Sequence, residues 1–150
     1  MSQLTPNFNL SELTVSQTAA RNGLNNTPGP SQTANLKLLC VLALQPLRDK
    51  LKNPVIVTSG YRSPSVNAAI GGARNSAHMS GLAADIYIPG MSSAELMKRI
   101  HTMGLPVDQV IDEFGSWVHV AVAPKGQTPR REYLIARYQN GGAVYSRANL

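Results

Sequence analysis

Two of the three histidines in the chain lie near an acidic residue or an apolar run at spacings that suit a metal site. His78 and Asp85 are separated by Gly81, and a glycine at this place permits the chain to turn so that both side chains approach one point. His119 lies in a later apolar run. Two histidines and one carboxylate form the protein ligand set of a catalytic zinc site, which leaves a fourth position for water. These three residues are therefore candidate metal ligands.

Strand alternation gives Asp85 and His119 the same placement. Residues 83–88 and 117–122 are short apolar runs of strand type. Alternate side chains of a strand point to opposite faces, so Asp85 and His119 each lie on the face away from the apolar core positions. If the two strands are neighbours, both residues meet His78 on one side of a sheet. Spacing alone leaves a second interpretation open, in which each is an ordinary hydrogen-bonded polar group.

An acidic pair precedes the second run and offers a general base. Hydrolysis at a metal needs a carboxylate beside the attacking water to accept its proton. A three-residue loop over residues 114–116 would place Glu113 on the face of His119, whereas a two-residue loop would place Asp112 there. The sequence leaves both arrangements open.

His101 and Cys40 receive structural interpretations. His101 lies in the last turn of a predicted helix, where an imidazole interacts favourably with the helix carbonyls. Cys40 is the single cysteine and lies within an apolar stretch, so we expect a buried core residue without catalytic activity.

Length and composition restrict the class of protein. A chain of 150 residues with 43% hydrophobic and 15% charged residues is one ordinary domain rather than a disordered tail, a coiled coil or a fibre. No apolar run approaches the roughly 20 residues of a membrane span. The net charge is +6, which attracts polyanions. The basic residues are scattered rather than clustered with aromatic residues, so we expect no nucleic-acid partner.

The elements that must position these residues follow an order of helices first and strands later, which predicts an α+β fold with a small, mainly antiparallel sheet flanked by helices. Ser31 is the expected N-cap of the second helix, and Pro46 is expected to kink or break it. Ser92 and Glu95 form a capping box before the last helix. The expected helices cover residues 11–22, 31–52, 63–70 and 92–103, and the expected strands cover residues 54–58, 83–88, 109–113, 117–122, 133–139 and 143–147.

Several motifs together resemble one protein family. They are Ser59-Gly60-Tyr61-Arg62-Ser63, Asn67, Gly71-Gly72, Ser76-Ala77-His78, Gly81, Ala84-Asp85, Glu113 and Trp117-Val118-His119. This combination resembles the D-alanyl-D-alanine carboxypeptidase-like zinc peptidases, which share a fold with the hedgehog signalling domain and with bacterial and phage murein peptidases. Residues 10–13 and 45–48 resemble the short phage-type members, so the resemblance covers about residues 8–148.

The resemblance implies roles for individual residues. His78, Asp85 and His119 match the ligands of one zinc ion, and Arg62 matches the arginine that binds the scissile carbonyl or a substrate carboxylate. Glu113 matches the catalytic carboxylate of hedgehog-like members. Many carboxypeptidase members carry that carboxylate three residues before the last histidine, where this chain has Ser116. Asp112 is therefore the reserve candidate.

The resemblance gives two more residues a place beside the substrate. Ser76 is expected to support the loop of the first ligand or a substrate group, and Trp117 to form a wall of the cleft.

The function that the resemblance implies is a zinc-dependent peptidoglycan peptidase that hydrolyses an amide bond of the stem peptide or cross-link. It would be an endopeptidase or a D,D-carboxypeptidase, and a phage lysis or virion-associated enzyme. A non-catalytic, hedgehog-like zinc-binding module is the alternative. We expect a monomer of one domain, residues 1–150, in which residues 1–30 form an N-terminal extension. The first residues lack a signal peptide pattern, so we expect synthesis in the host cytoplasm and action at the bacterial cell wall or periplasm.

Overall fold

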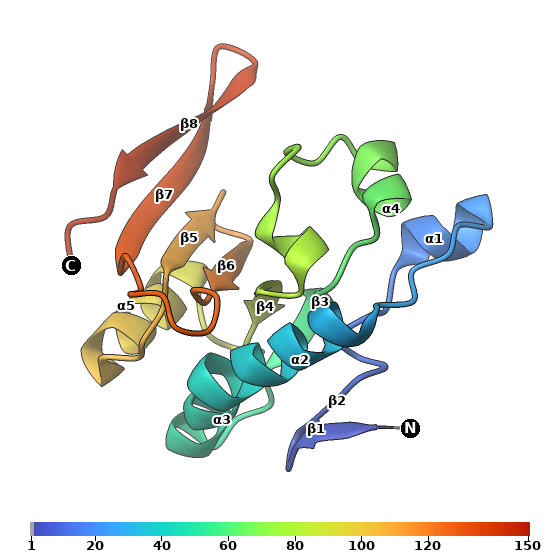
Figure 1. Ribbon diagram of the computed structural model, residues 1–150. Helices are drawn as coiled ribbons and strands as arrows, with labels where there is room; N and C mark the ends of the chain where they lie inside the picture. The colour runs from blue at the N-terminus through green and yellow to red at the C-terminus, as the bar shows by residue number, and fades with distance from the viewer. Residues whose placement is uncertain (1) are drawn as a thin grey trace.

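The computed structural model describes residues 2–150, which form a mostly antiparallel six-stranded sheet with helices packed against it (Figure 1). The predicted α+β fold is confirmed. Among the strands of residues 2–150, only the β5–β7 pair is parallel. In sheet order the strands are β3 (Ile56–Ser59), β4 (Ala83–Tyr87), β6 (Trp117–Ala121), β5 (Gln109–Glu113), β7 (Glu132–Gln139) and β8 (Gly142–Arg147). A separate ribbon pairs β1 (Gln3–Thr5) with β2 (Phe8–Asn9).

The helices bury the apolar side of the sheet. The valines and isoleucines of the inward strand positions join leucines of the helices in one core cluster, which contains Leu36, Leu39, Leu44, Leu47, Ile86, Leu96, Ile100, Val110, Val118 and Val120. The opposite side of β4 and β6 is left for polar residues. The helical segments are α1 (Gln17–Asn22), α2 (Pro30–Leu39), the π-helical η1 (Cys40–Leu44), α3 (Gln45–Leu51), α4 (Pro64–Ala69), the 3-10 turn η2 (Ala77–Ser80) and α5 (Ser93–Met103).

Two helix starts differ from the prediction. The first helix begins at Gln17 rather than near residue 11, because the Ser16 side chain accepts a hydrogen bond from the Ala19 N–H and caps the helix there. The second begins at Pro30, with Gly29 as N-cap, rather than after Ser31. Proline suits the first helical turn because its fixed φ is already helical and its missing N–H is not needed there.

Pro46 does not end the second helix. Over Cys40–Leu44 the hydrogen bonds shift to the wider π pattern, and the Gln45 N–H bonds the Cys40 carbonyl. The α-helix then resumes with Pro46 in its first turn, where its missing N–H costs nothing. The helix therefore does not break at Pro46 as expected; only its hydrogen-bond pattern changes, and the helix itself is continuous.

The cap of the last helix agrees with the prediction, and the loop length between β5 and β6, which the sequence left open, is three residues. Ser92 Oγ accepts from the Glu95 N–H at 3.1 Å, which confirms the cap of α5. Glu113 pairs with Trp117, so β5 and β6 are joined by three residues. In the β7–β8 hairpin, Asn140 and Gly141 both have positive φ, as a two-residue type I′ turn requires.

The N-terminal segment packs directly against the turn that follows β3. Phe8 and Leu13 belong to the core. The Leu13 carbonyl accepts from the Tyr61 N–H at 2.7 Å, and a Cβ at Gly60 would collide with that same carbonyl. Glycine is therefore required at this close approach. The division of the chain into one domain with an N-terminal extension stays a prediction.

Cys40 is fully buried in the core, as expected. Burial raises the pKa of its thiol to about 12, so the reactive thiolate does not form at neutral pH. Among residues 2–150, none of the helices has the length and apolar character needed to cross a membrane.

Candidate active site

Strands β4 and β6 are neighbours and place Asp85 directly opposite His119. His78 lies in η2, just before β4. Asp85 Oδ1 is 3.3 Å from His78 Nε2 and 3.3 Å from His119 Nδ1. One ligand atom from each of the three residues lies within 4.8 Å of the other two. The structure therefore brings together the three predicted metal ligands.

Local structure fixes the position of His78. Ser76 Oγ accepts from the His78 N–H at 3.2 Å and caps η2 at its start. Gly81 ends the turn at φ 78°. A Cβ at Gly81 would collide with the carbonyl of Gln32 in α2, so the turn is pressed against that helix.

The His78 ring has one defined tautomer. Its Nδ1 is 2.8 Å from the Gly60 carbonyl oxygen, which only accepts hydrogen bonds, so Nδ1 carries the proton. Nε2 then presents a lone pair toward the Asp85 carboxylate, and this buried atom has no hydrogen-bond partner among residues 2–150. Two facing lone pairs need a proton or a cation between them. Metal-bound histidines commonly donate their other N–H to a backbone carbonyl in this way.

The donor set fits a zinc ion. Zinc takes imidazole nitrogen and carboxylate oxygen at about 2.0–2.2 Å in a tetrahedral arrangement, so its ligand atoms lie roughly 3.3 Å apart. That is the spacing of Asp85 Oδ1 from both imidazoles. Burial raises the pKa of Asp85, but a hydrogen bond donated by His119, together with the charge that either imidazole carries when it is protonated, outweighs burial and lowers that pKa below the usual range. Asp85 is therefore ionised at neutral pH, as a metal ligand must be.

The three residues form the floor of a cleft of about 340 Å³. Its lining also contains four of the other residues predicted for the site and two apolar residues of the loop after α4; the complete lining is Arg62, Ile70, Ala73, Ser76, His78, Asp85, Glu113, Trp117 and His119. All predicted site residues except the reserve Asp112 therefore meet in one place.

Glu113, not Asp112, shares the face of His119. The three-residue loop after β5 pairs Glu113 with Trp117, whereas Asp112 pairs with Val118 on the core face. Burial raises the pKa of Glu113, and the Asp85 charge raises it further. A carboxylate with a raised pKa in a cleft is suited to accept and donate a proton near neutral pH.

Arg62 is held by backbone and side-chain contacts. Its N–H donates to the His78 carbonyl at 3.1 Å, and its Nη1 donates to Asn67 Oδ1 at 3.2 Å. Asn67 in turn donates to the Ala73 carbonyl at 2.9 Å. Burial lowers the pKa of Arg62, but an arginine so far above neutral pH stays charged. Its buried Nε has no hydrogen-bond partner among residues 2–150, so the guanidinium has an unused N–H donor for a ligand in the cleft.

Two groups that position the site residues were not predicted from the sequence. Asn67 orients the Arg62 side chain, and the Gly60 carbonyl selects the His78 tautomer. Both residues belong to the motifs of the resemblance, but only the folded chain brings them to their partners. Ser76 Oγ caps the turn that carries His78, and Trp117 forms part of the cleft lining with its indole N–H buried; contact of either residue with a substrate stays a prediction.

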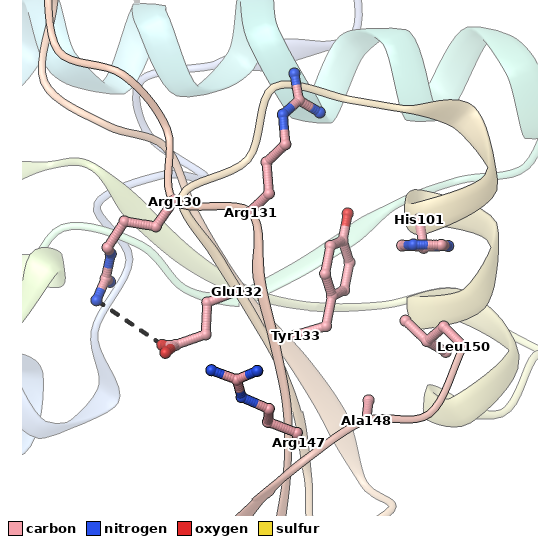
Figure 2. A pocket seen from close by; sticks show the side chains of 8 residues that line it. All are labelled: His101, Arg130, Arg131, Glu132, Tyr133, Arg147, Ala148 and Leu150. Carbon is pink, nitrogen blue, oxygen red and sulfur yellow. Dashed lines mark ion pairs between the residues drawn. The ribbon is translucent and has the colours of Figure 1, made fainter.

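A second hollow, here called the arginine pocket, lies against β7 and α5 and measures about 370 Å³ (Figure 2). Arg130 pairs with Asp108 at 3.0 Å, and Arg131 Nη1 donates to the Leu105 carbonyl after α5 at 3.0 Å. The ring of His101 contacts that of Tyr133 edge-on, 5.0 Å between centroids. The arginine pocket is lined by His101, Arg130, Arg131, Glu132, Tyr133, Arg147, Ala148 and Leu150.

A family model described as Peptidase M15 matches residues 6–121, which include every residue of the cleft lining. No curated protein matches the chain.

Proposed function

Since the chain belongs to the peptidase M15 family, we propose that it is a zinc-dependent peptidase that hydrolyses an amide bond of bacterial peptidoglycan. The observation that carries the proposal is the meeting of His78, Asp85 and His119 with Glu113 and Arg62 in one cleft. A ligand set, a general base and an oxyanion-binding cation are the parts that metal-assisted amide hydrolysis needs.

The metal would be held by His78 Nε2, Asp85 Oδ1 and His119 Nδ1, and a bound zinc ion supplies a Lewis acid that brings the pKa of water to about 7. The Gly60 carbonyl keeps the proton on His78 Nδ1, so Nε2 is free to coordinate. Asp85 contributes a negative charge that lowers the net charge of the site.

Glu113 accepts the proton of the attacking water and then delivers it to the leaving amine. One carboxylate performs both steps because protonation in the first makes it an acid for the second. The raised pKa of Glu113 lies closer to neutral pH than that of an ordinary glutamate, which suits a group that both accepts and donates a proton. Its position opposite Trp117 puts the carboxylate on the same face of the sheet as His119.

Arg62 binds the carbonyl oxygen that becomes negative during attack, or the terminal carboxylate of the substrate. The planar guanidinium offers paired donors to an oxyanion, and Asn67 keeps it oriented toward the cleft. This contact would serve either an endopeptidase or a D,D-carboxypeptidase. The bond that we propose to be cleaved lies in the stem peptide or in the cross-link.

The biological setting that we propose is a phage lysis enzyme or a virion-associated enzyme acting on the cell wall as a monomer. A net charge of +6 favours association with the anionic polymers of the bacterial envelope.

Digestion of purified peptidoglycan, with the fragments identified by mass, tests the proposal. We expect new amino termini within the peptide part, no fragments in the presence of a chelator, and recovery of cleavage when zinc is restored. Absence of cleavage by a protein that retains one zinc ion would instead identify a non-catalytic, hedgehog-like zinc-binding module.

A further inference from the structure

The side of the sheet that carries the cleft continues onto the β7–β8 hairpin. Glu113 is paired with Ala136 of β7, and Ala136 is paired with Tyr145 of β8. Directly paired residues of neighbouring strands point to the same face, so the Tyr145 side chain lies on the face of Glu113. Adjacent strands are about 4.8 Å apart, which puts the Tyr145 backbone roughly 10 Å from that of Glu113.

A row of aromatic rings follows the same path. Phe114 contacts Trp117 of the cleft wall, with 6.1 Å between ring centroids, and stacks on Tyr138 of the hairpin at 4.1 Å and 10°. Tyr138 lies two residues after Ala136 and therefore on the same face. Phe114 adopts φ 59°, which is unfavourable for a bulky residue. The fold retains this strained backbone, and the ring connects the cleft to the hairpin.

The tyrosines are exposed although they are large. Tyr138 is 73% exposed and Tyr145 is 52% exposed, whereas Ala136 between them and Glu113 is fully buried. The Glu113 charge also adds to burial in raising the pKa of the Tyr145 hydroxyl, which agrees with the two residues being neighbours. Exposed rings beside a cleft are typical of a binding surface.

We propose that this hairpin surface, made of Phe114, Tyr138 and Tyr145, binds the sugar rings of a polymeric substrate whose peptide is cleaved in the cleft. The inference rests on the proposed function for the cleft. Tyrosine presents a flat apolar ring and a polar hydroxyl, which suits a sugar ring with its C–H face and its hydroxyl groups. The roughly 10 Å between the Glu113 and Tyr145 backbones corresponds to about three residues of extended peptide, so a sugar about three residues away from the cleaved bond would reach this surface.

The surface lies mostly outside the matched part of the family. The match ends at residue 121, and β7 begins at Glu132. The proposed catalytic residues thus lie within the matched region, whereas the two hairpin tyrosines lie outside it. Binding energy from a remote part of the substrate increases the rate of its cleavage without any contact at the reacting bond.

Binding of peptide-free glycan strands by the full chain tests the proposal without any hydrolysis. Threonine retains strand propensity, so Tyr138→Thr/Tyr145→Thr preserves the hairpin while it removes both rings. We expect this double variant to bind the strands roughly tenfold more weakly than the wild type. Val144→Thr is the matched control, because Val144 lies next to Tyr145 on the opposite face and is 44% exposed. It should bind as the wild type does.

Cleavage kinetics separate this proposal from the proposed function. On a muropeptide that carries its disaccharide, the double variant should lose roughly tenfold in kcat/KM, whereas on the same peptide without sugar it should equal the wild type. The sugar assignment is overturned if the double variant loses activity equally on both substrates. It is also overturned if the wild-type protein cleaves the muropeptide but does not bind glycan strands. Loss of a dimer in the double variant would assign the surface to a second copy and also overturn it. A wild type that binds glycan but cleaves neither substrate contradicts the proposed function alone.

Discussion

The cleft and the arginine pocket are both lined by charged side chains, but they differ in whether those side chains have partners. In the cleft, His78 Nε2 and Arg62 Nε are buried without a hydrogen-bond partner among residues 2–150. In the arginine pocket, Arg130 is paired with Asp108, and Arg131 donates to backbone carbonyls. Two of the three arginines that line the second hollow are thus engaged by the chain itself.

This difference separates sites of chemistry from sites of structure. A buried polar atom without a partner costs about 1–3 kcal/mol of folding free energy. A fold tolerates that cost where a ligand supplies the missing partner. Substitutions in the cleft are therefore expected to change metal binding or turnover with little loss of stability, and substitutions in the arginine pocket are expected to do the reverse.

The largest effect is expected for the metal ligands. His119→Ala should lower the zinc content from about one ion per chain to near zero and abolish hydrolysis, because it removes one of three protein ligands. Metal analysis of the purified protein measures this. His101→Ala is the matched control, since His101 lies in the arginine pocket, and it should retain full zinc. Full zinc in His119→Ala would remove His119 from the ligand set.

Substitution of the general base is expected to have the next largest effect. Glu113→Gln should lower kcat roughly 100- to 10,000-fold while zinc content and the unfolding midpoint stay unchanged, because glutamine is nearly isosteric but accepts no proton. Asp112→Asn should remain active, because Asp112 lies on the core face. Normal cleavage by Glu113→Gln together with an inactive Asp112→Asn would make Asp112 the base.

Arg62→Lys is expected to lower kcat by roughly 100- to 1000-fold, the cost of removing one oxyanion donor. Lysine retains the charge but loses the planar fork that Asn67 orients. Arg131→Lys in the arginine pocket should leave kcat within about twofold of the wild type, since its contacts are to backbone carbonyls after α5. Steady-state kinetics compare the two. An active Arg62→Lys enzyme would give Arg62 a structural role.

The smallest effect concerns the arginine pocket and pH. Burial raises the pKa of Asp108, but hydrogen bonds and charge from Arg130 outweigh it and lower the pKa below the usual value. A lowered pKa in the folded state stabilises the protein above the unfolded-state value of about 4, and this contribution is lost as pH falls through the folded-state value. The unfolding free energies of wild type and Asp108→Asn should therefore differ more at pH 7 than at pH 3.

The size of that difference is limited because Arg130 is 58% exposed and solvent screens the pair, so we expect less than about 1 kcal/mol. Urea unfolding at both pH values measures it. A difference that is unchanged at low pH would show that the substitution acts through packing rather than through charge, and a loss of hydrolysis at pH 7 would contradict the separation between the two hollows.

The meeting of the proposed metal ligands was predictable because strand alternation is a strong local rule. Asp85 and His119 interrupt short apolar strands, and the two strands are indeed neighbours, with Asp85 paired to His119. The choice between Glu113 and Asp112 was not predictable from alternation, since it depends on loop length. The three-residue loop contains left-handed backbone at both Phe114 and Gly115, and a bulky aromatic residue rarely adopts that conformation.

Other features depend on contacts between distant segments and leave no local signal. The hydrogen bond from Asn67 to Arg62 and that between His78 and the Gly60 carbonyl form only in the folded chain. The passage of the helix through Pro46 was missed for a different reason. A proline in a helical pattern predicts a break. It does not predict the π-helical segment before Pro46, which removes the need for an N–H at that residue.

The close approach of Leu13 to Gly60 has a consequence for protein engineering. The Leu13 carbonyl holds the Tyr61 N–H, and the neighbouring Gly60 carbonyl holds the ring of His78. Trimming the first residues to make a minimal domain, or fusing a rigid tag through them, would loosen the turn that presents His78, a candidate metal ligand. A tag is therefore better placed at the other end of the chain, where it leaves both this turn and the β7–β8 hairpin intact.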